Sequence, residues 1–219
     1  NQQLDATVAM IRDAGLDVPC LSSSITVCLD EDGGLAELQH YLRLCRSFGS
    51  RFIRVFGGKP ADMSCSRAAG ILVERLNRLG DMAAEDRVTV LLETHDAWTR
   101  TADVADIMSR LDHPYVGVLW DTHHPYRFAG EAFKESWENI GRWVRYTHVK
   151  DSVEDPSAPH GARLCLPGEG SIPLRSLWQL LQEKGYEGYF TLEWERPWQK
   201  HLPPPEIAFP RFVELCASF

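Results

Sequence analysis

The stretch Val116-Gly117-Val118-Leu119-Trp120-Asp121-Thr122-His123-His124-Pro125 decides the fold that the sequence predicts. A short apolar run with valine at alternate positions, preceded by Pro114, is typical of a buried strand. The run ends abruptly in an acid, a hydroxyl and two imidazoles. We therefore predict a strand whose polar end lies where the chain leaves the sheet.

Three other segments repeat this pattern of an apolar run that closes on a titratable side chain. They are residues 88–93 with Glu93, residues 143–148 with His148, and residues 188–193 with Glu193. The active sites of parallel barrels lie at the carboxyl ends of their strands. The four segments therefore predict one shared site at the mouth of a barrel.

Strand-like and helix-like segments alternate along the chain. The expected strands are residues 17–25, 51–56, 88–93, 116–121, 143–148 and 188–193, and the expected helices are residues 4–14, 35–48, 66–84, 101–111, 133–140, 173–184 and 204–218. Such alternation indicates an α/β fold with a parallel sheet and helices outside it. We predict a single (β/α)8 TIM-barrel domain over residues 1–219. Because such a barrel has eight strands, we expect its first strands to be missing from the N-terminus of this sequence.

Two segments break the regular pattern. Residues 151–172 are rich in proline and glycine, and a connection of this length in a compact domain is usually a lid or a binding loop. Pro210 falls inside the last expected helix, and we predict that it kinks or interrupts that helix.

Composition excludes several classes of protein. Hydrophobic residues make up 44% and charged residues 25%, as in a soluble globular domain. The net charge of −8 opposes nucleic acid as a partner, because phosphate binding needs a basic surface. No apolar run reaches the roughly 18 residues of a membrane span, so we expect no membrane association. The six cysteines form no CxxC pair, which favours reduced thiols, small hydrophobes in apolar patterns, and a cytoplasmic location.

Glu93, Asp121, His148 and Glu193 form the candidate metal site. Three carboxylates and one imidazole are ligands for a divalent cation such as Mn²⁺, Co²⁺, Mg²⁺ or Zn²⁺. A single acid after a strand would be weak support, since loops are polar. The prediction depends on four such ends occurring together.

The sequence resembles the xylose isomerase-like TIM-barrel superfamily, in particular its sugar phosphate isomerase/epimerase branch. The matching motifs lie in family order within residues 17–195, and they are Leu91-Leu92-Glu93-Thr94-His95, Leu119-Trp120-Asp121-Thr122-His123-His124-Pro125, His148-Val149-Lys150-Asp151, Pro167-Gly168-Glu169-Gly170-Ser171-Ile172-Pro173 and residues 185–193. The resemblance implies a metal held by Glu93, Asp121, His148 and Glu193, and substrate contacts from His95 and His124. The chain departs from many relatives at Tyr146, where they carry a second histidine.

The chemistry follows from the residue types. Moving a proton at a carbon beside a carbonyl requires a polarised oxygen and a base. We assign Glu93 and Glu193 as the catalytic acid and base, because carboxylates from different strands can face a substrate from different sides. The predicted function is isomerisation or epimerisation of a small sugar, ketose or sugar phosphate through an enediolate.

Several further residues have both a site interpretation and a structural one. Lys150 and Arg163 could neutralise a phosphate or carboxylate of the substrate, or could be solvated surface charges. Trp98 and Trp198 are candidates for an aromatic wall against a sugar, while Trp120, inside a strand, fits the core better. His123 and His124 are adjacent and cannot both enter the site, so we assign packing to His123.

Three alternatives remain open. An inosose-type dehydratase would use the same ligands on a cyclic polyol but eliminate water. A hydrolase related to apurinic endonucleases is disfavoured by the negative charge and the few histidines at strand ends. A non-catalytic sugar-binding barrel would bind no divalent metal. In each of the favoured cases the partner is a small carbohydrate, and the tryptophans and prolines of residues 194–205 suggest a homodimer contact.

Overall fold

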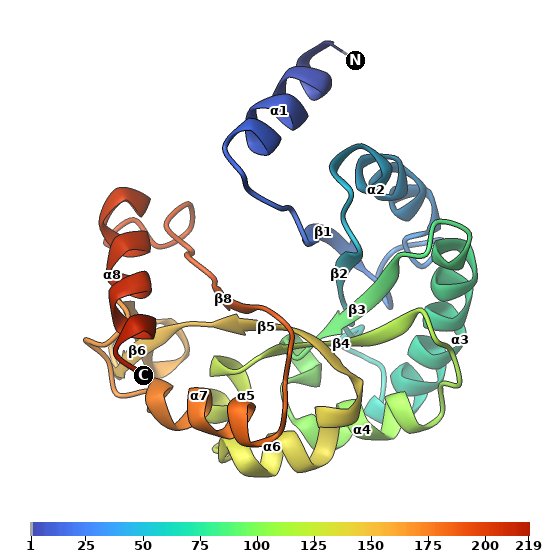
Figure 1. Ribbon diagram of the computed structural model, residues 1–219. Coiled ribbons are helices and arrows are strands. Elements are labelled where there is room, and N and C mark those ends of the chain that lie inside the picture. Colours follow the sequence, from blue (N-terminus) through green and yellow to red (C-terminus); the bar gives the residue numbers. More distant parts are fainter. Residues whose placement is uncertain (1) are drawn as a thin grey trace. The chain divides into compact units, whose positions relative to one another are not determined.

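The structure is a computed structural model that describes residues 2–219 (Figure 1). Asn1, with which the sequence begins in place of a methionine, lies outside the described residues. The chain divides into two compact units, unit 1 with residues 1–119 and unit 2 with residues 120–219. Each unit contains strand ends that carry candidate site residues.

Helices and strands alternate through unit 1, as the sequence predicted. The elements are α1 (Gln2–Asp13), β1 (Cys20–Thr26), α2 (Leu35–Phe48), β2 (Phe52–Phe56), α3 (Cys65–Ala84), β3 (Thr89–Glu93), the 3-10 helix η1 (Asp96–Trp98), α4 (Thr101–Ser109) and β4 (Val116–Asp121), whose last residues belong to unit 2. The four strands pair in parallel in chain order, with Phe52 opposite Thr89 and Glu93 opposite Leu119.

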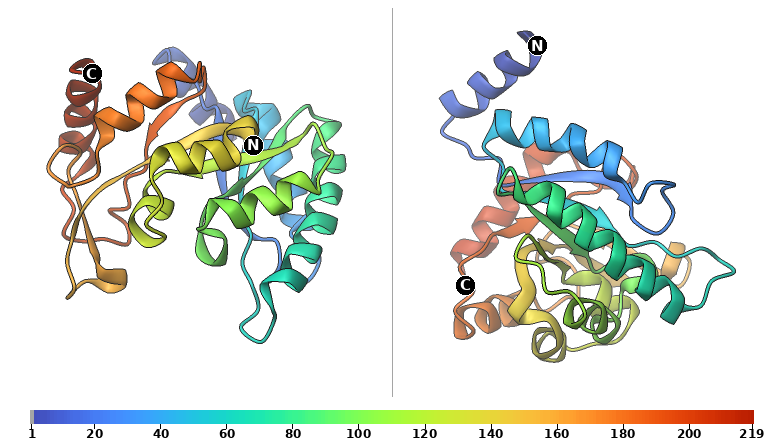
Figure 2. Two further views of the ribbon diagram at one scale, coloured as in Figure 1. Left: turned by 90° about the horizontal axis from the view of Figure 1, so that it is seen from below. Right: turned by 90° about the vertical axis from the view of Figure 1, so that its right-hand side faces the viewer.

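Helix α3 shows why these segments fold as they do. Leu72, Leu76 and Leu79 recur at helical spacing and are fully buried, so one face of the helix packs on the sheet beside β3. Ser64 begins the helix by accepting a hydrogen bond from the Arg67 N–H. Figure 2 shows α2 and α3 lying along the strands of unit 1, whereas α1, which has no buried residue, projects from them.

Unit 2 begins with the end of β4 and continues the parallel pattern. Its elements are α5 (His123–Phe128), α6 (Phe133–Ile140), the 3-10 helix η2 (Gly141–Trp143), β5 (Val144–Val149), β6 (Asp151–Glu154), the 3-10 helix η3 (Pro159–Gly161), β7 (Ala162–Cys165), α7 (Leu174–Glu183), β8 (Phe190–Leu192) and α8 (Pro205–Ala217). β5 and β8 are parallel, and the strand order is β1-β2-β3-β4-β5-β8. The expected six parallel strands are confirmed among the described residues.

Residues 151–172 correct the expectation of one long irregular loop. β6 and β7 form an antiparallel hairpin, with Asp151 opposite Cys165. The remaining loop is fixed by the Asp151 carboxylate, which accepts hydrogen bonds from the backbone N–H groups of Gly168 at 2.8 Å, Gly170 at 3.0 Å and Ile172 at 3.2 Å. Because of the proline and glycine content, the sequence did not predict these two short strands or the loop that binds the buried Asp151 carboxylate.

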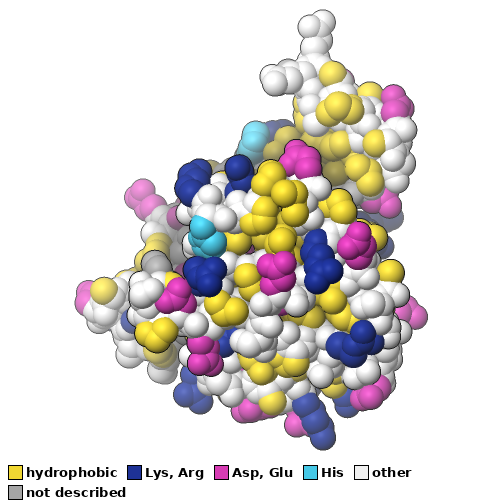
Figure 3. Space-filling model, turned by 90° about the vertical axis from the view of Figure 1, so that its left-hand side faces the viewer, with side chains coloured by type: hydrophobic (Ala, Val, Ile, Leu, Met, Phe, Trp, Pro, Cys, Tyr) yellow, Lys and Arg dark blue, Asp and Glu magenta, His cyan; other side chains and the backbone are white. Residues whose placement is uncertain are grey.

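Two helices also differ from expectation. The sequence predicted a polar exit after Asp121, but residues 123–128 form the short helix α5. Pro210 does not interrupt helix α8, which is continuous over Pro205–Ala217, so that part of the expectation is wrong. Its exposed side includes Ile207, Phe209 and Val213, and it lies on the face that Figure 3 shows, where apolar and charged side chains alternate.

The state of the cysteines and the character of the helices agree with what the composition predicted. All six cysteines are free thiols. Burial raises the pKa of Cys20 and Cys45 to about 12, so these two thiols stay protonated near neutral pH. Among residues 2–219, no helix combines the length and the apolar character that crossing a bilayer requires.

Candidate metal centre

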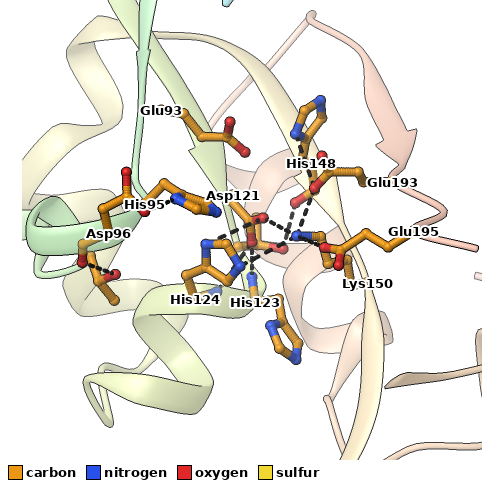
Figure 4. A network of polar contacts seen from close by, with 12 residues as sticks. Glu93, His95, Asp96, Asp121, His123, His124, His148, Lys150, Glu193 and Glu195 are labelled. Atoms are coloured by element: carbon orange, nitrogen blue, oxygen red, sulfur yellow. Dashed lines mark hydrogen bonds and ion pairs between the residues drawn. The ribbon is translucent and has the colours of Figure 1, made fainter. Parts of the chain in front are cut away.

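Three strand ends in unit 2 carry side chains of the metal-ligand type. Asp121 is the last residue of β4, His148 lies in β5, and Glu193 follows β8. The Thr122 N–H donates to the His148 carbonyl at 2.9 Å and the Glu193 N–H to the Val149 carbonyl at 3.0 Å, which brings these strand ends level. One ligand-type atom from each of Asp121, His148 and Glu193 lies within 4.8 Å of the others (Figure 4).

We call these three residues the unit 2 cluster. Asp121 has no exposed surface, and His148 is 5% exposed. A carboxylate at such depth is ionised only where neighbouring charges or hydrogen bonds compensate for lost hydration. The cluster therefore needs a cation close to its two acids.

Lys150 provides a positive charge at this position. Its Nζ lies 2.7 Å from Asp121 Oδ2, 2.6 Å from Glu193 Oε2 and 2.7 Å from Glu195 Oε1. The side chain is 3% exposed. The sequence led us to expect Lys150 to neutralise a substrate anion or to be solvated, but the structure places its ammonium among three carboxylates of the protein itself (Figure 4).

The charges around the cluster change the acidity of both acids. Burial on its own would raise the pKa of the Asp121 carboxyl, but His124 and Lys150 outweigh it and hold that pKa well below its ordinary value. Burial opposes ionisation of Glu193 as well, yet Lys150 and the hydrogen bond to His148 lower the pKa of Glu193 to about 2. Both acids are therefore anionic near neutral pH, which is the form that binds a metal.

The two adjacent histidines have separate surroundings. Asp121 Oδ1 accepts the backbone N–H of His123 at 2.9 Å and of His124 at 3.1 Å, which fixes the start of α5. The His123 ring is buried and lies 2.8 Å from Ser152 Oγ through Nε2. Burial lowers the pKa of His123 to about 3, so the ring is neutral. His124 instead faces the cluster, with Nδ1 3.6 Å from Asp121 Oδ2 and Nε2 3.3 Å from Lys150 Nζ.

Glu93 lies in unit 1 at the end of β3. Its side chain is 1% exposed, and its Oε2 is 2.7 Å from Arg54 Nη1. Arg54 comes from the middle of β2, and its guanidinium lies over the Phe56 ring at 3.9 Å from the ring centre. A buried ion pair held on one side by an aromatic ring fixes the direction of the carboxylate.

His95, the other predicted substrate contact of unit 1, follows the same strand. Its Nδ1 lies 2.6 Å from Asp96 Oδ1, and its ring centre is 4.6 Å from that of Phe56. Asp96 has a φ of 53°, in the left-handed region that few residues other than glycine adopt. The imidazole is partly exposed beside the strand end.

Sequence reasoning missed Arg54 and Glu195. Arg54 is the one charge inside the apolar run Phe52-Ile53-Arg54-Val55-Phe56, and a charge at such a position implies a buried partner. Glu195 lies two residues after Glu193, at the alternate spacing that keeps side chains on one side of an extended chain. Both signals were present in the sequence, but neither identifies its partner.

Trp98 lies in different surroundings from those expected of a substrate residue, whereas Arg163 and Trp120 lie in surroundings that the sequence allowed. Trp98 is 1% exposed, and its Nε1–H donates to the Gly58 carbonyl at 2.8 Å, so it belongs to the core of unit 1 rather than to an accessible wall. Arg163 is half exposed on β7 and pairs with Asp155 at 3.3 Å, as a surface charge does. Trp198 is 79% exposed, and Trp120 is buried against Phe133 and Trp137.

Comparison with known proteins defines the class. Residues 1–209 match the family described as xylose isomerase-like TIM barrel, and the chain therefore belongs to this family. The solved structure of the IOLI protein with a binding zinc atom is similar over 99% of this chain and 82% of its own, with a TM-score of 0.81 and 19% identity. At that identity the likeness concerns the fold alone.

Two curated relatives carry enzyme names. An inosose dehydratase of Geobacillus thermodenitrificans (strain NG80-2) is 28% identical over 140 residues, which cover 58% of this chain and 47% of the relative. A fructoselysine 3-epimerase of Escherichia coli O157:H7 is 30% identical over 129 residues, which cover 57% of this chain and 45% of the relative. The chain thus spans about half the length of the curated relatives that it matches.

Proposed function

We propose that this chain is a divalent-metal-dependent enzyme that isomerises or epimerises a small sugar, ketose or sugar phosphate. The observation that carries the proposal is the unit 2 cluster, in which two carboxylates and one imidazole from three strand ends converge within 4.8 Å. Oxygen and imidazole ligands fit Mn²⁺, Co²⁺, Mg²⁺ or Zn²⁺. The depressed pKa values of Asp121 and Glu193 supply the anionic form that such an ion requires.

Glu93 is the proposed fourth ligand. It pairs with Leu119 in the parallel register of β3 and β4, and the Thr94 N–H donates to the Leu119 carbonyl at 3.1 Å. Asp121 lies two residues further along β4. Because side chains two residues apart in a strand point to the same face, we expect Glu93 and Asp121 to face the same way.

The residues divide the work as follows. A bound divalent ion supplies Lewis-acid polarisation of a substrate carbonyl. Glu193 and Glu93 remove and return the proton at the neighbouring carbon, as carboxylates on separate strands. Arg54 orients the Glu93 carboxylate, and His95 and His124 donate or accept hydrogen bonds at substrate hydroxyls. The enzyme names of the two curated relatives support a reaction of this kind on sugar-like substrates.

Solvent exchange tests the proposal directly. The purified protein with Mn²⁺ is incubated in D₂O with a panel of small ketoses and keto-inositols, and proton NMR follows loss of the carbon-bound proton beside the carbonyl. We expect deuterium incorporation that Glu193→Gln abolishes and that Glu214→Gln, at an exposed position on α8, leaves unchanged. Exchange that persists undiminished in Glu193→Gln would overturn the assignment of the base.

A dehydratase is the second candidate, supported by the inosose dehydratase relatives. Mass spectrometry of the same reactions separates the two, because elimination lowers the substrate mass by one water and isomerisation leaves it unchanged. A chain that binds Mn²⁺ neither alone nor with any sugar would instead support the non-catalytic binding barrel.

A further inference from the structure

Lys150 is a buried cation whose partners include two of the proposed metal ligands. An ammonium group has three N–H donors. Carboxylate oxygens of Asp121, Glu193 and Glu195 lie 2.6–2.7 Å from its Nζ, and His124 Nε2 lies 3.3 Å from it. With its ammonium surrounded by these groups of the protein, Lys150 is poorly placed to bind an anionic substrate group.

The same two carboxylate oxygens cannot serve an ammonium and a divalent ion equally well. Metal–oxygen distances at such sites are about 2.0–2.2 Å. Nζ already lies 2.7 Å from Asp121 Oδ2 and 2.6 Å from Glu193 Oε2. An ion bound to both oxygens would stand within a few ångströms of the ammonium, in a buried region where like charges repel strongly.

Glu195 gives Lys150 a position outside the ligand set. Its Oε1 is 2.7 Å from Nζ, and its side chain is 26% exposed, compared with 0% for Asp121. Pairing with Glu195 alone would let the ammonium withdraw from Asp121 and Glu193 without losing a charged partner. This residue plays no part in the proton transfer proposed above.

We propose that Lys150 is an internal cation that competes with the divalent ion for Asp121 and Glu193, and that Glu195 retains the ammonium when the ion binds. The inference rests on the proposed metal site and adds a control of its affinity. Without the ion, the Lys150 ammonium neutralises the charge of Asp121 and Glu193. When the divalent ion binds, it takes over this neutralisation. Lys150 and Glu195 are thus positioning residues that set how tightly the ion is held.

Mn²⁺ titration of the full chain tests this, with free Mn²⁺ measured from its EPR signal. We expect Lys150→Met to bind Mn²⁺ about tenfold more tightly than the wild type, because a nearby competing charge is gone. Glu195→Gln should bind Mn²⁺ several-fold more weakly, because the ammonium then loses a carboxylate partner outside the ligand set. Lys134→Met is the matched control, since Lys134 is 75% exposed in a surface pair with Glu138.

A double variant separates competition from simple loss of charge. If Glu195 acts through Lys150, adding Glu195→Gln to Lys150→Met should change Mn²⁺ affinity much less than it does in the wild type. An equal effect in both backgrounds would contradict the proposed part of Glu195.

Thermal unfolding provides an independent readout. In EDTA, Lys150→Met should unfold at a lower temperature than the wild type, because its buried acids repel one another, and Mn²⁺ should raise its midpoint more than that of the wild type. If Lys150→Met is unfolded in EDTA, folding on addition of Mn²⁺ supports the inference and failure to fold contradicts it.

The outcomes also distinguish this inference from the proposed function. Wild type that binds Mn²⁺ while Lys150→Met binds it equally or more weakly overturns only the competition. Absence of Mn²⁺ binding in every variant, the wild type included, overturns the metal site and the inference with it.

Discussion

Asp121 and Asp151 are both buried aspartates of unit 2, but the regions around them are held together differently. The Asp151 carboxylate accepts four backbone N–H groups, and it anchors the loop before α7. The donors are Ser152 at 2.9 Å, Gly168 at 2.8 Å, Gly170 at 3.0 Å and Ile172 at 3.2 Å. One oxygen of Asp121 accepts backbone N–H groups, whereas the other lies 2.7 Å from the side-chain ammonium of Lys150.

We infer from this difference that Asp151 holds the fold together, whereas Asp121 is the acid available to a ligand. Backbone donors are fixed by the fold and cannot leave without distorting it. A lysine side chain can swing away and be replaced by a metal ion. Burial alone does not separate the two cases, since Asp121 is 0% and Asp151 3% exposed.

The largest expected effect is on metal binding by Asp121→Asn. Loss of one anionic ligand should weaken Mn²⁺ binding at least about 100-fold. Isothermal titration calorimetry measures this, with Asp155→Asn in the hairpin as a control that should bind as the wild type does. If Asp121→Asn bound Mn²⁺ as tightly as the wild type, Asp121 would not be a metal ligand.

The largest expected loss of stability is at Asp151. Asp151→Ala leaves several backbone N–H groups without their acceptor and should lower the free energy of unfolding by about 3–5 kcal/mol. Gly170→Ala should act in the same direction, because a Cβ there would overlap the Asp151 carboxylate. Urea unfolding in EDTA provides the measurement. If Asp121→Asn lost more unfolding free energy than Asp151→Ala, Asp121 rather than Asp151 would be the acid that holds the fold together.

A smaller effect is expected in the pH dependence of stability. Burial lowers the pKa of His123 from 6.5 to about 3. Between these values the unfolded chain binds a proton that the folded chain does not, so stability falls as the pH falls below 6.5. The limiting slope is about 1.4 kcal/mol per pH unit. Urea unfolding in EDTA between pH 4 and 7 should therefore show a flatter profile in His123→Gln than in the wild type. Parallel profiles would show that His123 is not the group responsible.

The smallest effect is expected at Arg163. Its pair with Asp155 is solvent-exposed and screened, so Arg163→Ala should leave the midpoint of urea unfolding unchanged within error. A clear loss of stability would indicate that the hairpin depends on this pair as it does on Asp151.

The strands and long helices were predictable because their apolar residues recur at regular strand or helix spacing over the whole element. Leu72, Leu76 and Leu79 mark the buried face of α3, and the alternating valines mark β4. The β6/β7 hairpin was not predictable from the sequence, because its strands have only four residues each and show no long apolar alternation. Helix α5 was missed because it has only six residues and follows the strand directly, although Thr122 stands at its N-cap position.

The sequence predicted which ligand-type residues lie at the candidate site, but not which charged groups neutralise them. Strand ends identified Asp121, His148 and Glu193, which the structure brings together. Nothing in spacing indicates that Lys150 lies among three carboxylates or that Arg54 pairs with Glu93. Those contacts depend on strand register and side-chain depth, which only the folded chain defines. The four-ligand set itself remains a prediction.

Anomalous diffraction from crystals grown with Mn²⁺ tests the central claim most directly. We expect one peak about 2.0–2.3 Å from side-chain atoms of Asp121, His148, Glu193 and Glu93, with Lys150 withdrawn toward Glu195. A crystal with saturating Mn²⁺ but no peak between these residues, and with Lys150 still bound to Asp121 and Glu193, would contradict it.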